Sequence, residues 1–351
     1  MRTLFIVDTP SQVYNIIDAI AVYRIDNYDV IINDCNRADT YQQLQARLVE
    51  LNPTQLFEVP RVEGKISDRI EAYGKFIKTF IQTGYKNVFF SAIRQQWQRD
   101  IVCTLQAENT VLMDDGNATV IFYEYLFTHR KFFDFPYDSD DDRRQLALQT
   151  RKKLGIETKE LPSLSLFTMF NLASLPWLSV VKNPLLHLQR THKKLNQNQA
   201  FILGVGAVTV GYITLEKYVA LIARTAEEFP GKSIIYVPHR IESDLLLSKI
   251  EALGIAVKRF NKPIENELAE REEVPATIVS YHTTALFTCA RMFPHIDVVC
   301  VQPLMTTWED AADSHVWNFT ACNNLQGLET VYKYIDKEPS IRTIKLADSI
   351  R

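Results

Sequence analysis

The stretch TLFIVDTPSQ at residues 3–12 decides the class of fold. Its first five residues are almost all apolar, acidic Asp8 ends the run, and Thr9-Pro10 opens a longer amphipathic stretch. A short apolar run bounded by turn residues is typical of a buried strand, and proline is favoured in the first turn of a helix. The segment therefore predicts a strand that runs into a helix. With one basic residue before it and an early acidic residue, it does not read as a secretory signal.

The first half of the chain continues this alternation. Strands are predicted at residues 3–7, 30–32, 87–90 and 110–113, and helices at residues 41–51, 66–83 and 95–106. Strands separated by helices at this spacing predict parallel pairing with crossover helices. The regular pattern stops near Phe132, and the acidic run at residues 138–142 is interpreted as an exposed loop.

A second alternating unit follows the polar stretch at residues 196–199, which is interpreted as a linker. Its predicted strands are 200–203, 233–237, 256–259, 277–280 and 297–301, and its predicted helices are 214–229, 243–253 and 284–292. A chain of 351 residues is too long for one ordinary core. We therefore expect two α/β domains, residues 1–195 and 196–351, with a cleft between them.

Composition and charge exclude several classes of protein. Hydrophobic residues make up 46% of the chain and charged residues 23%, which is globular rather than disordered composition. The 39 basic and 42 acidic residues give a net charge of -3, so nucleic acid is not an expected partner. The five cysteines are scattered and form no CxxC pair, which argues against a zinc site and a disulfide framework. These thiols fit a reducing cytosol.

Residues 161–181 carry no charged side chain and have two interpretations. Four cations follow them, namely Lys182, Arg190, Lys193 and Lys194. Pro162 and Pro176 interrupt the stretch, and a membrane span needs roughly 20 mainly apolar residues, so buried helices between the domains are one interpretation. The other is an interfacial segment that the cations hold against anionic lipid. We expect a cytoplasmic protein, with peripheral contact to the inner face of the cytoplasmic membrane under the second interpretation.

Polar residues after predicted strands are the candidates for chemistry, because ligands of parallel sheets bind beyond the carboxyl ends of strands. The Asp-Asp-Gly at residues 114–116 offers a carboxylate that can accept a proton from a substrate hydroxyl, although it is also an ordinary turn. His239 can act as a general acid or phosphate ligand, or can be structural. Thr283 and Thr284 precede a predicted helix, where they can bind an anion or simply cap the helix.

Together these features resemble a known family of transferases. The Asp-Asp-Gly comes first, Tyr-Val-Pro-His at residues 236–239 follows with Glu242, and the threonine pair comes last. The opening segment 5–12 and the segment 211–218 also match, so the resemblance covers most of the chain. The chain is similar to the bacterial sialyltransferases, namely the lipooligosaccharide sialyltransferases of glycosyltransferase family 52 and the related bacterial polysialyltransferases.

The resemblance implies two Rossmann-like domains that face each other across a cleft, the GT-B arrangement. It implies an inverting transfer of sialic acid, or of a related nonulosonic acid, from a CMP-activated donor to a glycan hydroxyl. No metal and no cofactor would be required. The expected partners are the CMP-nonulosonic acid donor and a glycan or glycolipid acceptor in cell-surface lipooligosaccharide or capsule synthesis.

The resemblance also implies roles for individual residues. Asp114 would be the general base, Asp115 a supporting carboxylate, and His239 the group that protonates or hydrogen-bonds the CMP phosphate. The expected donor-binding residues are Gly204, Gly206, Pro238, Arg240, Glu242, His282, Thr283 and Thr284. The expected acceptor or cleft residues are Thr9, Pro10, Gln12 and Gly116.

Two departures from the family pattern leave alternatives open. Arg240 stands where the family usually has proline after the histidine, and two threonines replace a serine-containing pair. One alternative is a GT-B transferase with another donor, CMP-Kdo or a UDP-sugar, because fold alone does not fix function. The other is a non-catalytic protein that binds a nucleotide-sugar, for which Arg240 is the only support in the sequence.

Overall fold

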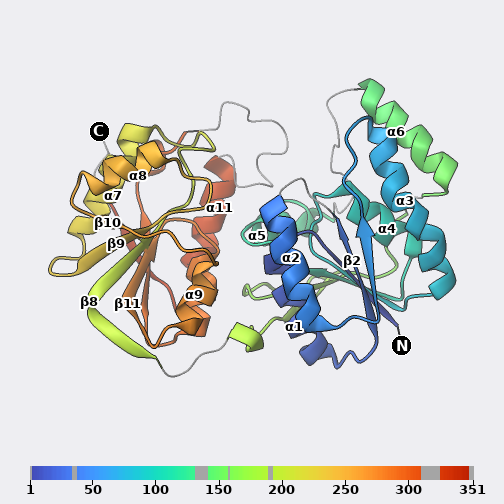
Figure 1. Cartoon of the computed structure of the whole chain (residues 1–351), viewed down its shortest axis with the longest axis horizontal. Coiled ribbons are helices and arrows are strands. Elements are labelled where there is room, and N and C mark those ends of the chain that lie inside the picture. Colours follow the sequence, from blue (N-terminus) through green and yellow to red (C-terminus); the bar gives the residue numbers. More distant parts are fainter. Residues whose placement is uncertain are drawn as a thin grey trace. The chain divides into compact units, whose positions relative to one another are not determined.

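The computed structural model describes residues 2–33, 38–130, 141–156, 159–188, 193–309 and 325–347. The chain divides into two compact units, Met1–Asp115 with Tyr125–His187, and Gly116–Glu124 with Leu188–Arg351. Each unit is built on a parallel sheet with helices packed against it (Figure 1). The expected division after residue 195 falls inside a strand, and the short segment Gly116–Glu124 groups with the second unit.

In the described part of the first unit, seven parallel strands form a sheet in the order β3-β2-β1-β4-β5-β6-β7. The strands are β1 (Thr3–Val7), β2 (Tyr28–Asn33), β3 (Gln55–Val59), β4 (Asn87–Phe90), β5 (Asn109–Met113), β6 (Ser165–Thr168) and β7 (Ser179–Lys182). Every residue of β1 is buried, because β1 pairs with β2 and β4 and carries core side chains such as Phe5 and Val7. The predicted bounds of β1 and β4 are confirmed.

Helices of the first unit cover both faces of this sheet. They are α1 (Pro10–Tyr23), α2 (Ala38–Leu51), α3 (Ile66–Thr83), α4 (Gln96–Leu105) and α6 (Asp141–Leu154), with short 3-10 helices η1 (Phe127–His129) and η2 (Leu186–Leu188). Helices α1 and α2 lie on one side of β2, and α3, α4 and α6 lie on the other (Figure 1). The predicted bounds of α3 are confirmed, because its apolar side chains at helical spacing are buried and Gly84, at φ +65°, ends it.

Within its described residues, the second unit has six parallel strands in the order β10-β9-β8-β11-β12-β13. The strands are β8 (Lys194–Leu203), β9 (Ser233–Val237), β10 (Ala256–Val257), β11 (Glu273–Ser280), β12 (Asp297–Gln302) and β13 (Arg342–Lys345). The helices are α5 (Ala118–Tyr125), α7 (Leu215–Glu227), α8 (Asp244–Glu251), α9 (Ile264–Glu270), α10 (Ala285–Met292) and α11 (Leu325–Ile335), with η3 (Met305–Thr307). Because β8 lies between β9 and β11, the loops after these three strands share one edge of the sheet.

Two interpretations of the sequence are wrong. Residues 196–199 are not a linker but belong to β8, whose first six residues are exposed or half-buried and therefore carry polar side chains. Residues 161–181 are not helical, since they contain β6 and most of β7. Apolar runs of four residues cannot be told from a buried helix by periodicity alone. Of the expected loop at residues 138–142, residues 138–140 lie outside the described residues. The last two residues of the expected loop begin α6.

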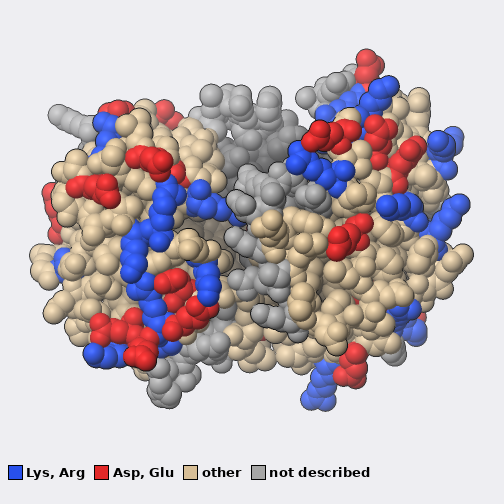
Figure 2. Space-filling model, in the orientation of Figure 1, with Lys and Arg blue, Asp and Glu red and all other residues tan. Residues whose placement is uncertain are grey.

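Three of the four cations after residue 181 form contacts within the protein. Lys182 and Lys193 donate from Nζ to main-chain carbonyls at 2.6 and 2.7 Å, and Lys194 pairs with Glu273 at 2.8 Å. Arg190 lies outside the described residues. The expected peripheral contact with a membrane stays a prediction. On the face that Figure 2 shows, basic and acidic side chains are interspersed over both units. Among the helices that the structure describes, none combines the length and apolar character needed to cross a membrane.

Candidate functional site

Three loops of the second unit hold all eight of the expected donor-binding residues. They follow β8, β9 and β11, and they comprise residues 204–206, 238–242 and 281–284. These strands are parallel neighbours, so their carboxyl ends lie at the same edge of the sheet. This is the edge at which open α/β sheets bind ligands.

The buried carboxylate of Glu242 joins two of these loops. Its Oε1 accepts the main-chain N–H of Gly206 at 2.9 Å, and its Oε2 accepts the main-chain N–H of His239 at 3.0 Å. The hydroxyl of Tyr236 donates to Oε2 at 2.9 Å. Burial raises the pKa of Glu242, and these hydrogen bonds oppose the rise because they favour the charged form. Glu242 therefore fixes the shape of the loops rather than presenting a charge to a ligand.

The two expected glycines are required by close packing around this carboxylate. A Cβ at Gly204 would lie 2.5 Å from the Tyr236 hydroxyl and 2.7 Å from Glu242 Oε1. Gly206 has φ +68°, and a Cβ there would lie 2.8 Å from the Ile241 side chain. Glycine thus allows both a left-handed backbone and a close approach of two loops.

His239 is half-buried and follows Pro238 directly after β9. Its Nδ1 lies 3.5 Å from the main-chain N of Ile241, a long hydrogen bond that favours the neutral form with its proton on Nε2. Burial lowers the pKa of His239, and the positive charge of Arg240 adds to this effect. The imidazole is therefore neutral at pH 7 unless an anion binds beside it. Arg240 itself is exposed.

His282 is buried at 7% exposure beneath aromatic rings. Trp308, Tyr212 and Tyr332 meet its ring edge-on at centroid distances of 5.3, 5.9 and 6.5 Å. Burial lowers the pKa of His282 to about 4, and interaction with His239 contributes. The two histidines are therefore close enough to sense each other's charge, and His282 is a neutral ring at physiological pH.

Thr283 and Thr284 lie at the start of α10, as the sequence predicts. The Oγ1 of Thr283 accepts the main-chain N–H of Ala285 at 3.3 Å. The Oγ1 of Thr284 does not cap α10 but accepts the main-chain N–H of Asn117 at 3.1 Å. Both hydroxyl oxygens accept a main-chain N–H, so each hydroxyl retains its own hydrogen for donation to another group.

The Asp-Asp-Gly motif is divided between the units, because Asp115 ends a segment of the first and Gly116 begins one of the second. Asp114 is buried, and its Oδ2 accepts the main-chain N–H of Met169 at 2.7 Å. Asp115 retains 18% side-chain exposure and pairs with Arg94 at 3.1 Å. Asp115 is therefore the more accessible carboxylate, whereas Asp114 holds the loop after β6.

Sequence reasoning missed Asp8 as a site candidate. It is buried directly after β1, and its Oδ2 accepts Nε2 of Gln98 at 2.7 Å. Oε1 of Gln98 accepts the main-chain N–H groups of Ser91 and Ala92 at 3.1 and 3.0 Å, which fixes the amide so that its NH₂ faces Asp8. Burial raises the pKa of Asp8 to about 7, and the negative charge of Asp115 adds to this rise. An acidic residue at a strand end was the available signal.

The expected acceptor residues Thr9, Pro10 and Gln12 build the start of α1. Pro10 is its first residue, and Oε1 of Gln12 accepts the main-chain N–H of Asp8 at 2.7 Å and that of Thr9 at 3.3 Å. This capping arrangement ties the helix to the end of β1. Gln12 is buried, so the contacts give it a structural task beside Asp8.

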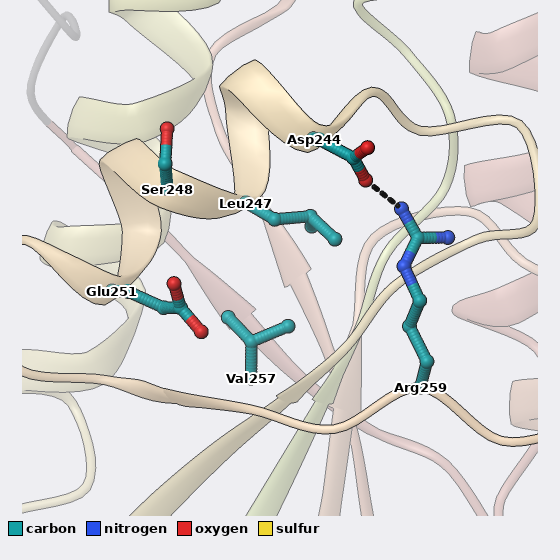
Figure 3. A pocket seen from close by; sticks show the side chains of 6 residues that line it. All are labelled: Asp244, Leu247, Ser248, Glu251, Val257 and Arg259. Atoms are coloured by element: carbon teal, nitrogen blue, oxygen red, sulfur yellow. Dashed lines mark hydrogen bonds and ion pairs between the residues drawn. The ribbon is translucent and has the colours of Figure 1, made fainter.

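A hollow of about 440 Å³ opens between α8 and β10 (Figure 3). It is lined by Asp244, Leu247, Ser248, Glu251, Val257 and Arg259. Arg259 pairs with Asp244 at 2.9 Å and donates to the main-chain carbonyl of Glu242 at 3.2 Å. None of the expected site residues is among those that line this hollow, so it is a separate feature of the second unit.

Within the described ranges, no three His, Cys, Asp or Glu side chains gather in a way that could hold a metal ion. Of the five cysteines, Cys103, Cys289 and Cys300 are buried thiols outside disulfides, and Cys35 and Cys322 lie outside the described residues. Metal-independent chemistry stays a prediction.

Comparison with known proteins identifies the fold but no sequence family. No protein-family model matches the chain, and no curated protein matches its sequence. UGT73P12 from Glycyrrhiza uralensis, complexed with glycyrrhetinic acid 3-O-monoglucuronide, is similar at a TM-score of 0.51 and 8% identity, over 99% of this chain and 82% of that one. MurG from Acinetobacter baumannii has a TM-score of 0.48 at 8% identity, over 98% and 86%. UDP-GlcNAc 2-epimerase from Methanocaldococcus jannaschii has a TM-score of 0.47 at 12% identity, over 100% and 94%.

At such low identities the likeness concerns the fold alone, and the resemblance to sialyltransferases stays a prediction. The fold has the two α/β units that the sequence pattern predicts, each with a parallel sheet, and it is the GT-B fold that the family resemblance implies.

Proposed function

We propose that this protein is a glycosyltransferase that takes a sugar from a nucleotide-activated donor. The observation that carries the proposal is the gathering of Thr283, Thr284, His239 and His282 at the carboxyl edge of the second sheet. Hydroxyl and imidazole donors beside a helix N-terminus suit the phosphates of a nucleotide. The GT-B fold supports the proposal by analogy only, because one fold hosts several activities.

His239 would act on the phosphate that leaves with the nucleotide. Its imidazole is neutral at pH 7 because burial lowers its pKa, so Nε2–H first donates a hydrogen bond. A phosphate anion beside the ring would raise this pKa again and favour proton transfer to the leaving group. General acid catalysis of this kind is worth about 10²–10⁴-fold in rate. The two threonine hydroxyls would add hydrogen bonds to the same phosphate.

Asp115 is the better candidate for the general base than Asp114, which the family resemblance implies. Both carboxylates have partners, since Asp114 accepts the Met169 N–H and Asp115 pairs with Arg94, but Asp114 is buried whereas Asp115 is partly exposed. In the proposed step, the acceptor hydroxyl oxygen bonds to the anomeric carbon as its proton passes to Asp115. The bond from that carbon to the phosphate oxygen breaks, and the nucleotide leaves with the electron pair. Direct displacement inverts the anomeric configuration.

The proposed donor is a CMP-activated nonulosonic acid, and the acceptor is a glycan hydroxyl of a cell-surface glycolipid or capsule. Support for this choice comes from the order of the sequence motifs, since the resolved fold is shared by proteins with other ligands. No metal or cofactor is needed if hydrogen bonds from the threonines and a hydrogen bond or proton from His239 stabilise the phosphate that leaves. A UDP-sugar donor and a non-catalytic role are the competing outcomes of the test.

Calorimetric titration without metal tests the site and the donor together. Wild-type protein should bind CMP more tightly than UDP, and Thr284→Val should weaken CMP binding by roughly 10-fold or more, because a hydrogen bond to a charged group is lost. Ser248→Ala is the matched control, since this exposed hydroxyl lines the separate hollow. Tighter binding of UDP would reassign the donor, and binding of neither nucleotide would refute the proposal.

Turnover separates a transferase from a binding protein. Nucleotide-sugars should be incubated with and without glycan acceptors and scored for release of the nucleotide. A transferase should release CMP from a CMP-nonulosonate faster when an acceptor is present. Tight binding of CMP with no release under any acceptor would favour the non-catalytic alternative.

A further inference from the structure

Asn117, which directly follows the Asp-Asp-Gly motif, bonds twice to the loop between β11 and α10. Its main-chain N–H donates to Thr284 Oγ1 at 3.1 Å, and its side-chain Nδ2 donates to the main-chain carbonyl of His282. The two residues joined by the first bond are 167 positions apart in the chain, and those joined by the second are 165 positions apart. Two motifs that are distant in sequence are thus joined within the second unit, by a residue that no sequence motif singles out.

Gly116 makes this docking possible. Its φ of +59° lies in the left-handed region, and a Cβ on it would lie 2.9 Å from Thr284 Oγ1. Any other residue would therefore strain the backbone and push against the hydroxyl. The glycine of the motif is explained by contact with the threonine loop as well as by its own turn.

The main-chain N–H of Asn117 also determines whether the Thr284 hydroxyl donates or accepts its next hydrogen bond. A hydroxyl has one hydrogen and two lone pairs, and the amide occupies an acceptor position of Thr284 Oγ1. Thr283 Oγ1 is occupied in the same way by the Ala285 amide. Both hydroxyls are thereby biased to donate their hydrogens, which is the polarity that a phosphate oxygen requires.

The segment that begins with Gly116 is held at its other end as well. Glu124 pairs with Lys333 at 2.6 Å and accepts the Tyr334 hydroxyl at 3.1 Å, so α5 is anchored to α11. Asp115 is bonded to Gly116, and consecutive Cα atoms are about 3.8 Å apart. Anything that moves the Thr284 hydroxyl therefore acts on a turn that begins one residue after Asp115.

We propose that Asn117 is a positioning residue that couples the anion site at Thr283 and Thr284 to the main chain of Asp115, which directly precedes the turn. A phosphate bound by the threonine hydroxyls would fix the loop at residues 282–284. This loop holds Asn117 by two bonds, from the main-chain N–H to Thr284 Oγ1 and from the side-chain Nδ2 to the His282 carbonyl. With both bonds in place, Asn117 would fix, through Gly116, the main chain of Asp115. The base would then be set in place when the donor is bound. This proposal rests on the proposed function, in which Asp115 takes the acceptor proton.

Amide hydrogen exchange tests the coupling without any substrate. The Asn117 amide should exchange slowly in the wild type, because Thr284 Oγ1 accepts its hydrogen. Thr284→Val should speed this exchange, and Thr284→Ser, which keeps the hydroxyl, should not. Adding CMP to the wild type should slow exchange in the peptide that spans residues 115–118. Fast exchange at Asn117 in the wild type, or equal exchange in the valine and serine variants, would overturn the proposed contact.

Turnover of two matched variants tests the consequence. Asn117→Ala removes the bond to the His282 carbonyl, and Glu124→Gln weakens the anchor at the other end of α5. The alanine variant should lose about 10-fold in kcat with donor KM within about 2-fold, because positioning is lost while the phosphate site remains. The glutamine variant should keep wild-type kcat. Melting temperatures verify that both variants fold.

The outcomes separate this proposal from the proposed function. If the wild type binds CMP and turns over, and Asn117→Ala does too with unchanged kcat, the coupling is wrong and the function stands. Equal losses in the alanine and glutamine variants would mean that docking of α5 matters only for folding, which also overturns the coupling. If the wild type binds neither CMP nor UDP, the proposed function fails and the coupling to a donor fails with it.

Discussion

Asp8→Asn should remove a pH dependence from the stability of the protein. The carboxyl of Asp8 is buried after β1 and accepts the Gln98 amide, and burial raises its pKa to about 7 from 3.8. Between these two values the folded state holds a proton that the unfolded state has released. The free energy of unfolding therefore falls as pH rises through this window, because deprotonation favours the unfolded chain.

The size of the effect follows from the two pKa values. They differ by about 3 pH units, and each unit corresponds to 1.36 kcal/mol, so the full loss is about 4 kcal/mol from low pH to above pH 7. About 2 kcal/mol of this loss falls between pH 5 and pH 7, and little more is lost above pH 8. Asparagine has nearly the same size, and its Oδ1 can still accept the Gln98 amide, but it does not titrate. At pH 8 the variant should accordingly be the more stable protein.

Urea denaturation at pH 5, 6, 7 and 8 measures the effect. The difference in unfolding free energy, wild type minus variant, should fall by about 2 kcal/mol from pH 5 to pH 7 and then level off. Subtracting the variant cancels the titration of the other groups. Parallel stability curves for the two proteins would refute the raised pKa, and so would a difference that grows with pH.

Three further predictions concern the base, a glycine and a buried ion pair. Asp115→Asn should lower nucleotide release with acceptor by about 10²-fold or more, whereas Asp114→Asn, which can still accept the Met169 amide, should stay within a few-fold; the reverse result would make the neighbour the base. Gly206→Ala should lower the unfolding free energy by about 2 kcal/mol and weaken CMP binding, because its Cβ would press on Ile241. The control is Gly231→Ala, also at positive φ, whose Cβ would have no other heavy atom within 4 Å. It should lower the unfolding free energy by only about 1 kcal/mol and leave CMP binding unchanged. Arg151→Met should lower the unfolding free energy in urea by about 3–5 kcal/mol. Arg151 pairs with the buried carboxylate of Asp100 at 2.7 Å, and the variant leaves that charge without its partner cation; a loss under about 1 kcal/mol would contradict this view.

The fold could be predicted from sequence wherever an apolar run had clear ends. Residues 3–7, 66–83 and 87–90 form the expected elements with the expected bounds, since turn residues or a glycine close each one. Short or half-exposed strands lack such a pattern in the sequence. β6 and β7 have four residues each, and the first half of β8 is polar because it faces solvent. Pairing with other strands identifies these segments as parts of a sheet, and β6 and β8 pair with strands that are distant in sequence.

The candidate site shows the same division between local and distant information. Strand ends pointed to Gly206, His239 and Thr284, because the position of a residue after a strand is a local property. The importance of Asn117 could not be read in this way, since its partners are more than 160 positions away. Its place directly after Asp-Asp-Gly was the one available signal. The same holds for Gln98, which lies on α4 and meets Asp8 90 positions away.

Glu242 explains why two of the three loops of the second unit, those after β8 and β9, can hold their arrangement before any ligand arrives. Burying a carboxylate is unfavourable by several kcal/mol unless hydrogen bonds compensate. Here the compensation comes from the amides of Gly206 and His239 and from the Tyr236 hydroxyl, so the charge is tolerated only while the loops after β8 and β9 keep this arrangement. A displaced loop would leave the carboxylate short of donors. Moving either loop would therefore raise the free energy of the folded protein, which favours the observed arrangement of both loops. Glu242 thus holds His239 at the sheet edge and need not touch the substrate itself.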